Sequence, residues 1–389
     1  MKQNDRTRDV FMLKGVLAKK GYDWWWHNFT GYRRSDGEKK SFFIEYFVCN
    51  PALGTDHPVL GQLPCNQEHG VKPSYALVKA GWWGQDAQQL HNFYAIRDFH
   101  ADPKTLAVRI GGCVLTETQM RGSCSVQRED AEAHPEYMSG WGTMSWDLQI
   151  QKQIAFNVGY GASAFMRRLN AFEMFWHAQG IKTQYSGEVY VNNEVYDILP
   201  ERSSGYADKN WGKDFTSPWV WVSSCNLKST VTGKALLHSA VEMGGGNPRV
   251  YGLSLGRQLL GCLYYEGTRY EYNFSKFWTG SKTDFSFAEG SDVNTWTIDA
   301  VNRTSRMELT LSCRKSDMLF MNYESPDGRK RHNRLWNGGT GYGTIRLYVK
   351  DGREWKLLDN IEITDAGCEY GEYGDDTPPA GISAAAGPV

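Results

Sequence analysis

One short segment gathers the residue types that are most capable of chemistry. The segment Gly205–Gly212 (GYADKNWG) supplies an acid, a base and an amide, Asp208, Lys209 and Asn210, directly before Trp211. These side chains could give or accept a proton and form hydrogen bonds beside an indole ring. They could equally cap a turn, as Asp and Asn often do, with Trp211 as an apolar plug in a core or between domains.

The segment that follows has the alternation of a strand. In 219–226 (WVWVSSCN), Trp219, Trp221 and Ser223 fall on one face, while Val220 and Val222 fall on the other. The two tryptophans could line a ligand cavity or fill a barrel interior, where they would still border any cavity present.

Two residues upstream are further candidates. Segment 162–177 is ambiguous: its apolar residues have near-helical spacing, so a short amphipathic helix is one of two interpretations. In such a helix Glu173 and His177 would stand four residues apart on one face and could touch. Alternatively, a strand already begins at Phe172, and His177 is then a structural histidine.

Two carboxylate placements call for an explanation. The clearest hairpin is Glu188–Asp197, with Asn192 and its neighbour in the turn, and it sets Glu188 opposite Asp197. Splayed surface ends or a shared proton would resolve that like-charge pair. In 41–48 (SFFIEYFV) both faces are apolar apart from Glu45, which either pairs with a base at the rim or points into a cavity.

Composition predicts the elements that must position these residues. Aromatic residues make up 14% of the 389 positions, with 15 Trp and 41 Gly, and half-buried strands between glycine-rich turns favour such a composition. We therefore predict an all-β protein of antiparallel sheets that are closed or nearly closed. The length favours two domains, divided at the polar stretch near 198–205, with residues 371–389 as a disordered tail. The predicted domains are 1–200 and 201–370.

Several classes of function are disfavoured. The net charge of -1 argues against a general nucleic-acid or anionic-membrane binder, and no apolar run approaches the roughly 20 residues of a membrane span. The nine His are dispersed and common nucleotide, zinc and hydrolase motifs are missing, so we expect no metal and no cofactor. The polar start of the chain predicts no secretory signal, which favours a cytoplasmic location and eight free thiols.

At this point the sequence resembles a known family. The pattern Gly-Tyr-x-acidic-Lys-Asn/Asp-Trp-Gly, then Phe, Trp-x-Trp and Asn, is similar to the hallmark of the tocopherol cyclase family and its bacterial relatives. The resemblance is close over about 172–227 and looser elsewhere. Related families are hydroxyneurosporene synthase (carotenoid hydratase) and lipocalin-like Diels–Alderases. The resemblance implies two lipocalin-like antiparallel β-barrel domains that enclose a hydrophobic substrate.

The resemblance also implies roles for individual residues. Asp208 matches the acidic position of the motif and would be the acid or orient it, with Glu173 and His177 as second candidates. Asn210 falls where many members have Asp, which removes one candidate acid. The substrate-binding residues would be Trp26, Tyr206, Asn210, Trp211, Trp219 and Trp221.

The resulting expectation is an isomerase or lyase that acts without a cofactor on a prenylated, polyene or polycyclic molecule. Acid-initiated cyclisation, hydration and double-bond migration all begin with the same proton transfer. Two alternatives stay open: a non-catalytic carrier of lipid or pigment, and a carbohydrate-binding or glycan-processing protein whose Trp24–Trp26 run stacks on sugars. The expected partner is a hydrophobic small molecule, with no nucleic acid and no membrane span.

Overall fold

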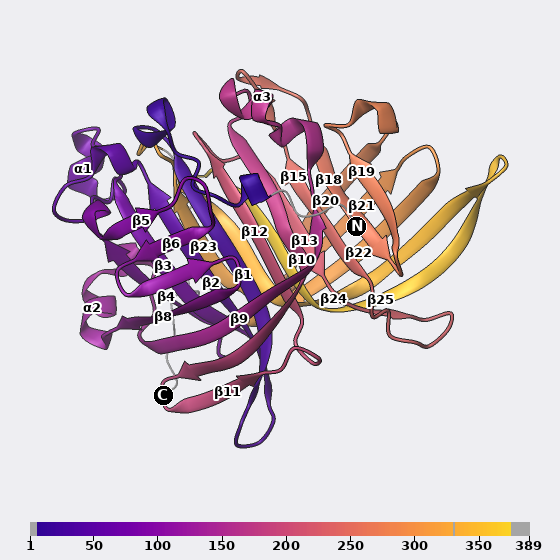
Figure 1. Cartoon of the computed structure of the whole chain (residues 1–389), viewed down its shortest axis with the longest axis horizontal. Coiled ribbons are helices and arrows are strands. Elements are labelled where there is room, and N and C mark those ends of the chain that lie inside the picture. The colour runs from indigo at the N-terminus through magenta and orange to yellow at the C-terminus, as the bar shows by residue number, and fades with distance from the viewer. Residues whose placement is uncertain (1–5, 330, 375–389) are drawn as a thin grey trace.

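Two antiparallel β-sheets, side by side, make up almost the whole protein (Figure 1). The computed structural model describes residues 6–329 and 331–374. The fold is nearly all-β, with one closed barrel and one sheet that is curled into a half-barrel. The expected all-β class of antiparallel sheets is confirmed, although only one of the two sheets closes fully.

The first sheet contains twelve strands and runs in the order β4-β3-β2-β1-β11-β10-β9-β8-β7-β6-β5, with β12 paired to both β1 and β10. Its strands are β1 (Tyr22–Arg33), β2 (Lys39–Cys49), β3 (Tyr75–Trp83), β4 (Gln88–Tyr94), β5 (Phe99–Ala101), β6 (Ala107–Ile110), β7 (Cys113–Thr116), β8 (Gln119–Val126), β9 (Gly142–Phe156), β10 (Met174–Val191), β11 (Glu194–Ile198) and β12 (Gly205–Gly212).

The second sheet contains eleven strands and runs in the order β19-β18-β15-β13-β25-β24-β22-β21-β20, with β14 beside β25 and β23 beside β24. Its strands are β13 (Trp219–Ser224), β14 (Asn226–Ser229), β15 (Ala240–Gly246), β18 (Gln258–Tyr265), β19 (Thr268–Asn273), β20 (Lys282–Glu289), β21 (Val293–Val301), β22 (Ser305–Arg314), β23 (Leu319–Glu324), β24 (Arg331–Asp351) and β25 (Glu354–Glu372). A separate small hairpin joins β16 (Arg249–Val250) to β17 (Leu253–Ser254).

Helices are short and lie in the connections. Single 3-10 turns occur at η1 (Arg6–Arg8), η2 (Gly15–Ala18), η3 (Pro51–Leu53), η4 (Ile96–Asp98), η5 (Pro135–Tyr137), η6 (Gly159–Ala162), η7 (Phe277–Thr279) and η8 (Lys315–Asp317). The α-helices are α1 (Pro64–Glu68), α2 (Arg128–Ala133) and α3 (Ala164–Arg168). The helix predicted over 162–177 is therefore confined to α3, and the alternative of a strand over its second half is confirmed in β10.

Three apolar layers fill the molecule, one inside each sheet and one between them. In β1 and β2, Trp25 and Phe42 belong to the core of the first sheet, whereas Trp24 and Phe43 point the other way, into the layer between the sheets. The same alternation in β13 sends Trp221 into that middle layer. Central strands of both sheets are consequently buried on two faces, which explains why their sequences are apolar throughout.

Some details of the predicted organisation can be compared with the structure. The Glu188–Asp197 hairpin has the predicted register, and Arg34 contacts both Glu188 and Asp197. The Tyr190 hydroxyl and then Arg34 lower the pKa of Glu188, and Arg34 lowers the pKa of Asp197, so the pair shares a cation and not a proton. The domain division at residue 200 stays a prediction, but the change of sheet falls later, between Gly212 and Trp219.

The predicted tail, 371–389, lies outside the described residues from 375 onward, while β25 continues to Glu372. All eight cysteines are free, as predicted, and six of them are buried.

Candidate active site

The strand β12 positions the candidate acid. All eight of its residues are buried, because β1 pairs along one edge and β10 along the other. Alternation turns Asp208 toward the second sheet and Lys209 toward the core of the first. A Cβ atom at Gly205 or Gly212 would lie 2.2 or 2.1 Å from a backbone oxygen, so only glycine fits at either end of this strand.

Asp208 lies between the sheets, where two aromatic side chains form hydrogen bonds with it. The Trp176 indole N–H donates to Oδ2 of Asp208 (2.7 Å), and the Tyr206 hydroxyl lies 3.1 Å from the same oxygen. The other oxygen, Oδ1, is buried and accepts no hydrogen bond of ordinary geometry from residues 6–329 and 331–374, although the Trp24 indole is close enough to Asp208 to lower its pKa slightly. Hydrogen bonds thus hold Oδ2 in place, while Oδ1 can carry a proton.

A second carboxyl, Glu242 of β15, completes a shared network with Asp208. The Tyr206 hydroxyl lies 3.2 Å from Oε1 of Glu242, and the Trp221 indole N–H donates to that oxygen (3.0 Å). A phenol has one proton, so Tyr206 can donate to only one of its two carboxyl neighbours. Both contacts are hydrogen bonds only if one carboxyl is protonated and donates to the phenol oxygen. The geometry therefore fits a network that holds an extra proton.

Two further carboxyls lie in the same layer. Glu45 forms an ion pair with Lys79 (2.9 Å) and accepts a hydrogen bond from the Tyr323 hydroxyl (2.9 Å). Two placements were predicted for Glu45: paired with a base at the rim, or pointing into a cavity. The structure shows a third, because Glu45 is fully buried and pairs with its base inside the molecule. Glu369 of β25 accepts from the Asn337 amide (2.6 Å).

Burial raises the pKa of three of these acids, Asp208, Glu242 and Glu369. Desolvation raises the pKa of Asp208 to about 7, although hydrogen bonds from Trp176 and Tyr206 oppose the shift. It raises the pKa of Glu369 to about 8 against the opposing Asn337 bond, and it holds the pKa of Glu242 well above its usual range. Asp208 can therefore carry a proton near neutral pH and still release it readily, which suits a general acid.

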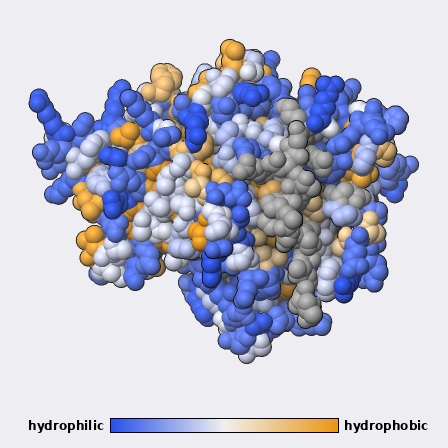
Figure 2. Space-filling view, turned by 180° about the vertical axis from the view of Figure 1, so that it is seen from behind, coloured by the Kyte–Doolittle hydropathy of each residue, from blue (hydrophilic) through white to orange (hydrophobic). Residues whose placement is uncertain are grey.

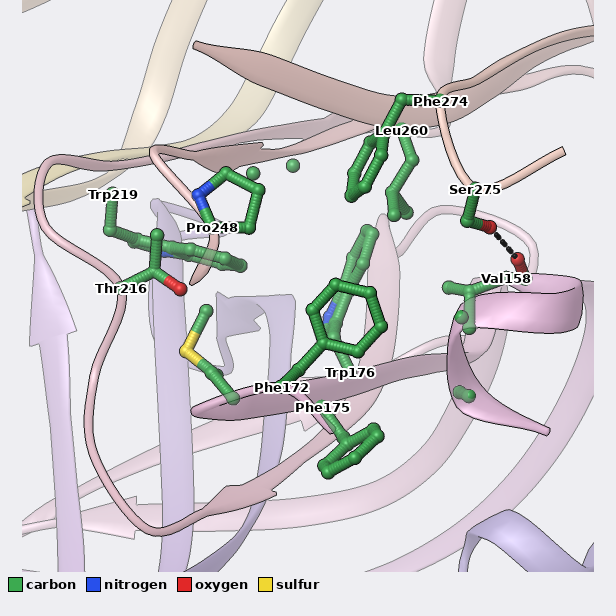
Figure 3. Close-up of a pocket in the computed structure, with 15 residues that line it drawn as sticks. Val158, Phe172, Phe175, Trp176, Thr216, Trp219, Pro248, Leu260, Phe274 and Ser275 are labelled. Carbon is green, nitrogen blue, oxygen red and sulfur yellow. Dashed lines mark hydrogen bonds between the residues drawn. The ribbon is translucent and has the colours of Figure 1, made fainter. Parts of the chain in front are cut away.

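An apolar pocket opens between the sheets next to this network (Figure 3). Its cavity volume is about 60 Å³, within about 530 Å³ of empty space that includes open solvent at the mouth. Aromatic and aliphatic side chains predominate on its walls, among them Phe172, Trp219 and Leu260, and backbone atoms of Gly244 and Gly245 form another part. Walls of this kind fit a hydrophobic molecule.

Trp176 separates the pocket from Asp208. Its ring lines the pocket, whereas its indole nitrogen donates to the carboxyl on the far side. A Cβ atom at position 244 would lie 3.1 Å from the Trp176 ring, so Gly244 allows the indole to approach the second sheet closely. Trp219 meets the same ring edge to face, with 6.3 Å between centroids.

The structure brings some of the sequence-predicted residues together. Tyr206, Trp221 and Asp208 share the network described above, and Trp219 lines the pocket. Trp26 pairs with Asp208 across β1 and β12 and stacks on Phe43 instead of lining the pocket.

Two of the predicted wall residues lie elsewhere. Asn210 is buried and accepts a hydrogen bond from the Tyr22 hydroxyl (2.7 Å). Trp211 stacks on Phe175 and lies on the face of β12 opposite to Asp208, because the two positions differ by an odd number of residues. Trp24–Trp26 are all buried, so this run offers no platform for sugars.

The two second-choice acids are not neighbours. Glu173 accepts hydrogen bonds from the Thr216 hydroxyl (3.0 Å) and from the backbone N–H of Arg249. His177 is fully buried and lies 3.4 Å from Asp9 inside the first sheet. The predicted contact between Glu173 and His177 is wrong, because the chain is extended at His177 and does not form a helix there.

Sequence reasoning missed Glu242, Glu369 and the role of Trp176. The signal for Glu242 was one carboxylate in the apolar, glycine-rich segment 240–246 (AVEMGGG). Glu369 stands in 366–371 (AGCEYG), where nothing local separates it from surface carboxylates. Both can be recognised as members of the site only once the second sheet is seen to pack against β12.

Two searches of the described part of the chain gave negative results. Within it, no cluster of three or more His, Cys, Asp or Glu side chains is arranged to hold a metal ion. None of the helices in the same residues is long and apolar enough to cross a membrane.

The fold and site define a class: a two-sheet β-protein with buried carboxyls and an apolar pocket between its sheets. The family follows from the sequence profile described as tocopherol cyclase-like, which matches residues 34–372, so the chain belongs to the tocopherol cyclase-like family. This membership supports a cyclase-type enzyme. A search of curated proteins found no match to the sequence.

Two solved structures are similar in overall arrangement. Kievitone hydratase from Nectria haematococca aligns over 96% of this chain and 96% of its own, with 11% identity and a TM-score of 0.49. An AttH protein from Nitrosomonas europaea aligns over 88% of this chain and 92% of its own, with 10% identity and a TM-score of 0.43.

Proposed function

We propose that the protein is an isomerase or lyase that protonates a carbon–carbon double bond of a hydrophobic molecule, with Asp208 as the general acid. The observation that carries this proposal is the Asp208 carboxyl itself. It is buried beside an apolar pocket, its pKa is raised to about 7, and its Oδ1 atom is available to hold a proton.

The proposed reaction balances without a cofactor. The O–H bond of protonated Asp208 breaks and a C–H bond forms at the alkene, which leaves a carbocation on the neighbouring carbon. Indole faces stabilise that cation, as does any ionised carboxylate in the layer. A substrate hydroxyl then forms a C–O bond in cyclisation, or water does so in hydration. The proton released in that step returns to Asp208, and loss of a C–H proton instead would complete double-bond migration.

Trp176 has to move for this reaction to occur. Its ring stands between the pocket and Asp208, so a bound substrate reaches the carboxyl only when the indole turns aside. This movement breaks the hydrogen bond that favours the ionised form of Asp208. Opening the path therefore also favours the protonated acid.

The first experiment is native mass spectrometry of the purified protein, followed by extraction of any co-purified small molecule. Turnover of an extracted prenylated or polyene compound is then measured for the wild type and for Asp208→Asn. We expect kcat to fall by about 10²–10⁴-fold with little change in ligand affinity, because the amide keeps the size of the carboxyl but has no acidic proton.

The matched control is Asn210→Asp, two residues along the same face of β12. It adds a carboxyl whose nearest described partner is Tyr22, and it should not restore turnover when combined with Asp208→Asn. Equal turnover by wild type and Asp208→Asn would rule out the assigned acid. Binding of the extracted compound without turnover by either protein would identify a carrier instead of an enzyme.

A further inference from the structure

The mouth of the pocket is surrounded by exposed apolar side chains. Three segments form the mouth: 159–171 with η6 and α3, 247–257 with β16 and β17, and 274–282 with η7. Together they carry a set of six residues that we call the apolar collar. The apolar collar consists of Phe165, Leu169, Tyr251, Leu253, Phe277 and Trp278.

The apolar collar is unusual in how far its side chains project into solvent. Phe277 is 80% exposed, Leu253 75% and Phe165 60%. Hydrophobic patches project from the upper edge of the molecule in Figure 2, the edge at which α3 lies in Figure 1. Soluble proteins expose single apolar residues commonly, but contiguous exposed patches mark interaction sites.

Hydrogen bonds tie the three segments together around the mouth. The backbone N–H of Tyr251 donates to the carbonyl of Ala171 (3.0 Å), and the Ser275 hydroxyl donates to the carbonyl of Val158 (3.1 Å). The apolar collar is thus continuous with the pocket walls, since Phe172, lying next to Ala171, lines the pocket. Whatever covers the collar lies directly over the pocket mouth.

The charge of these segments indicates what covers them. The three segments contain six basic residues and no acidic one, although acidic and basic residues are balanced over the chain, 44 to 43. Lys276 is paired with Glu271, but Arg168, Arg249 and Lys282 are exposed. Exposed aromatic and aliphatic residues among basic side chains are typical of proteins that lie on an anionic lipid surface.

We propose that the protein docks on an anionic lipid bilayer through the apolar collar, with the pocket mouth facing the membrane. The apolar side chains enter the boundary between headgroups and acyl chains, while the basic side chains contact lipid phosphates. A hydrophobic molecule can then pass between bilayer and pocket without crossing water. The net charge of -1 argued against binding to an anionic membrane. It does not reveal that the three segments around the mouth carry basic residues and no acidic ones.

The test is co-sedimentation with vesicles of phosphatidylcholine, with and without phosphatidylglycerol. The wild type should bind vesicles that contain phosphatidylglycerol and lose binding at high salt. The double variant Leu253→Ser/Phe277→Ser should bind about tenfold more weakly, because two apolar anchors are lost. The matched control is Val231→Ser/Leu237→Ser, which removes two equally exposed apolar side chains from the connection between β14 and β15. It should bind like the wild type.

Several outcomes would overturn the proposal. Equal binding by wild type and collar variant would do so, as would no binding of the folded wild type to either vesicle. Sedimentation velocity distinguishes a protein partner: a wild-type dimer that the collar substitutions dissociate, without vesicle binding, would make the collar a contact between copies. Asp208→Asn should bind vesicles like the wild type, so the vesicle experiment tests the docking independently of the proposed reaction.

Discussion

The two faces of β12 contact two buried polar clusters of different composition. On the face toward the core of the first sheet, Lys209 pairs with Asp23, and Asp9 lies near both His177 and Lys152. We call this group the paired cluster. On the other face lie Asp208, Glu242, Glu369 and Glu45, and the one ammonium that the described residues place among them is that of Lys79, which pairs with Glu45. We call this group the acid-rich cluster.

The residues of the two clusters are buried to nearly the same extent, so the clusters differ mainly in the ratio of carboxyls to basic side chains. In the paired cluster two carboxylates face two lysines, which is how buried charges are normally tolerated. In the acid-rich cluster the carboxyls outnumber the bases, and desolvation is relieved by protonation instead. Desolvation also raises the pKa of Asp23 in the paired cluster, to about 6, although its ion pair with Lys209 opposes the shift. The acid-rich cluster has fewer cations for its carboxyls and is better suited to holding a proton, so we place the proposed chemistry there.

The largest effect is expected from breaking the paired cluster. Lys209→Met should lower the free energy of unfolding by about 3–5 kcal/mol, because it leaves Asp23 buried without its cation. Guanidinium denaturation followed by tryptophan fluorescence measures this loss. A change below about 1 kcal/mol would show that the paired cluster does not depend on this ion pair.

The next effect is the pH dependence of the acid-rich cluster. The pKa of Asp208 is raised from 3.8 to about 7, so the folded protein keeps a proton that the unfolded chain releases between these values. Its stabilising contribution is complete below about pH 4 and is lost as the pH rises through 7. Relative to the wild type, Asp208→Asn should therefore gain about 2–4 kcal/mol of stability between pH 4 and 8.

Denaturation of both proteins at several pH values measures that difference, and the comparison cancels the titration of the groups that do not interact with Asp208. A constant difference across this range would mean that Asp208 titrates at the same pH in the folded and unfolded protein.

The smallest effect concerns one hydrogen bond. Trp176→Phe removes the indole N–H that donates to Asp208 but keeps an aromatic ring at the pocket wall, so the pKa of Asp208 should rise further above 7. The infrared band of the protonated carboxyl, assigned by its loss in Asp208→Asn, reports this pKa. Trp219→Phe is the control, since Trp219 lines the same pocket and makes no hydrogen bond to Asp208 within the described residues. An unchanged band in Trp176→Phe would mean that this bond does not tune the acid.

The sequence was sufficient where neighbours in space are also close in the chain. The hairpin Glu188–Asp197 followed from period-two alternation and an Asn turn, and its register is confirmed. Tyr206, Asp208 and Trp221 could be grouped because β12 and β13 are consecutive strands. The family resemblance added the reason to regard this group as a site.

The rest depended on how the two sheets pack, which no local pattern records. Glu242 and Glu369 come from strands far along the chain, and they meet Asp208 only through the packing of the two sheets. Over 162–177 the near-helical spacing is explained in part by a real helix, because Phe165 lies in α3 and Leu169 caps it. Trp176 belongs to β10, whose first half is buried on both faces, so its apolar residues do not alternate and gave no strand signal.

The structure of β12 also limits how its sequence can vary in length. Asp208 and Lys209 are adjacent, and each is buried on its own side of the strand. Inserting or deleting one residue within β12 would send the ammonium into the acid-rich cluster and a carboxylate into the paired cluster, unless the whole strand slipped. Slippage is blocked because Gly205 and Gly212 lie against backbone atoms that leave no room for a side chain. Related proteins should therefore tolerate substitutions along this strand more readily than any change in the number of its residues.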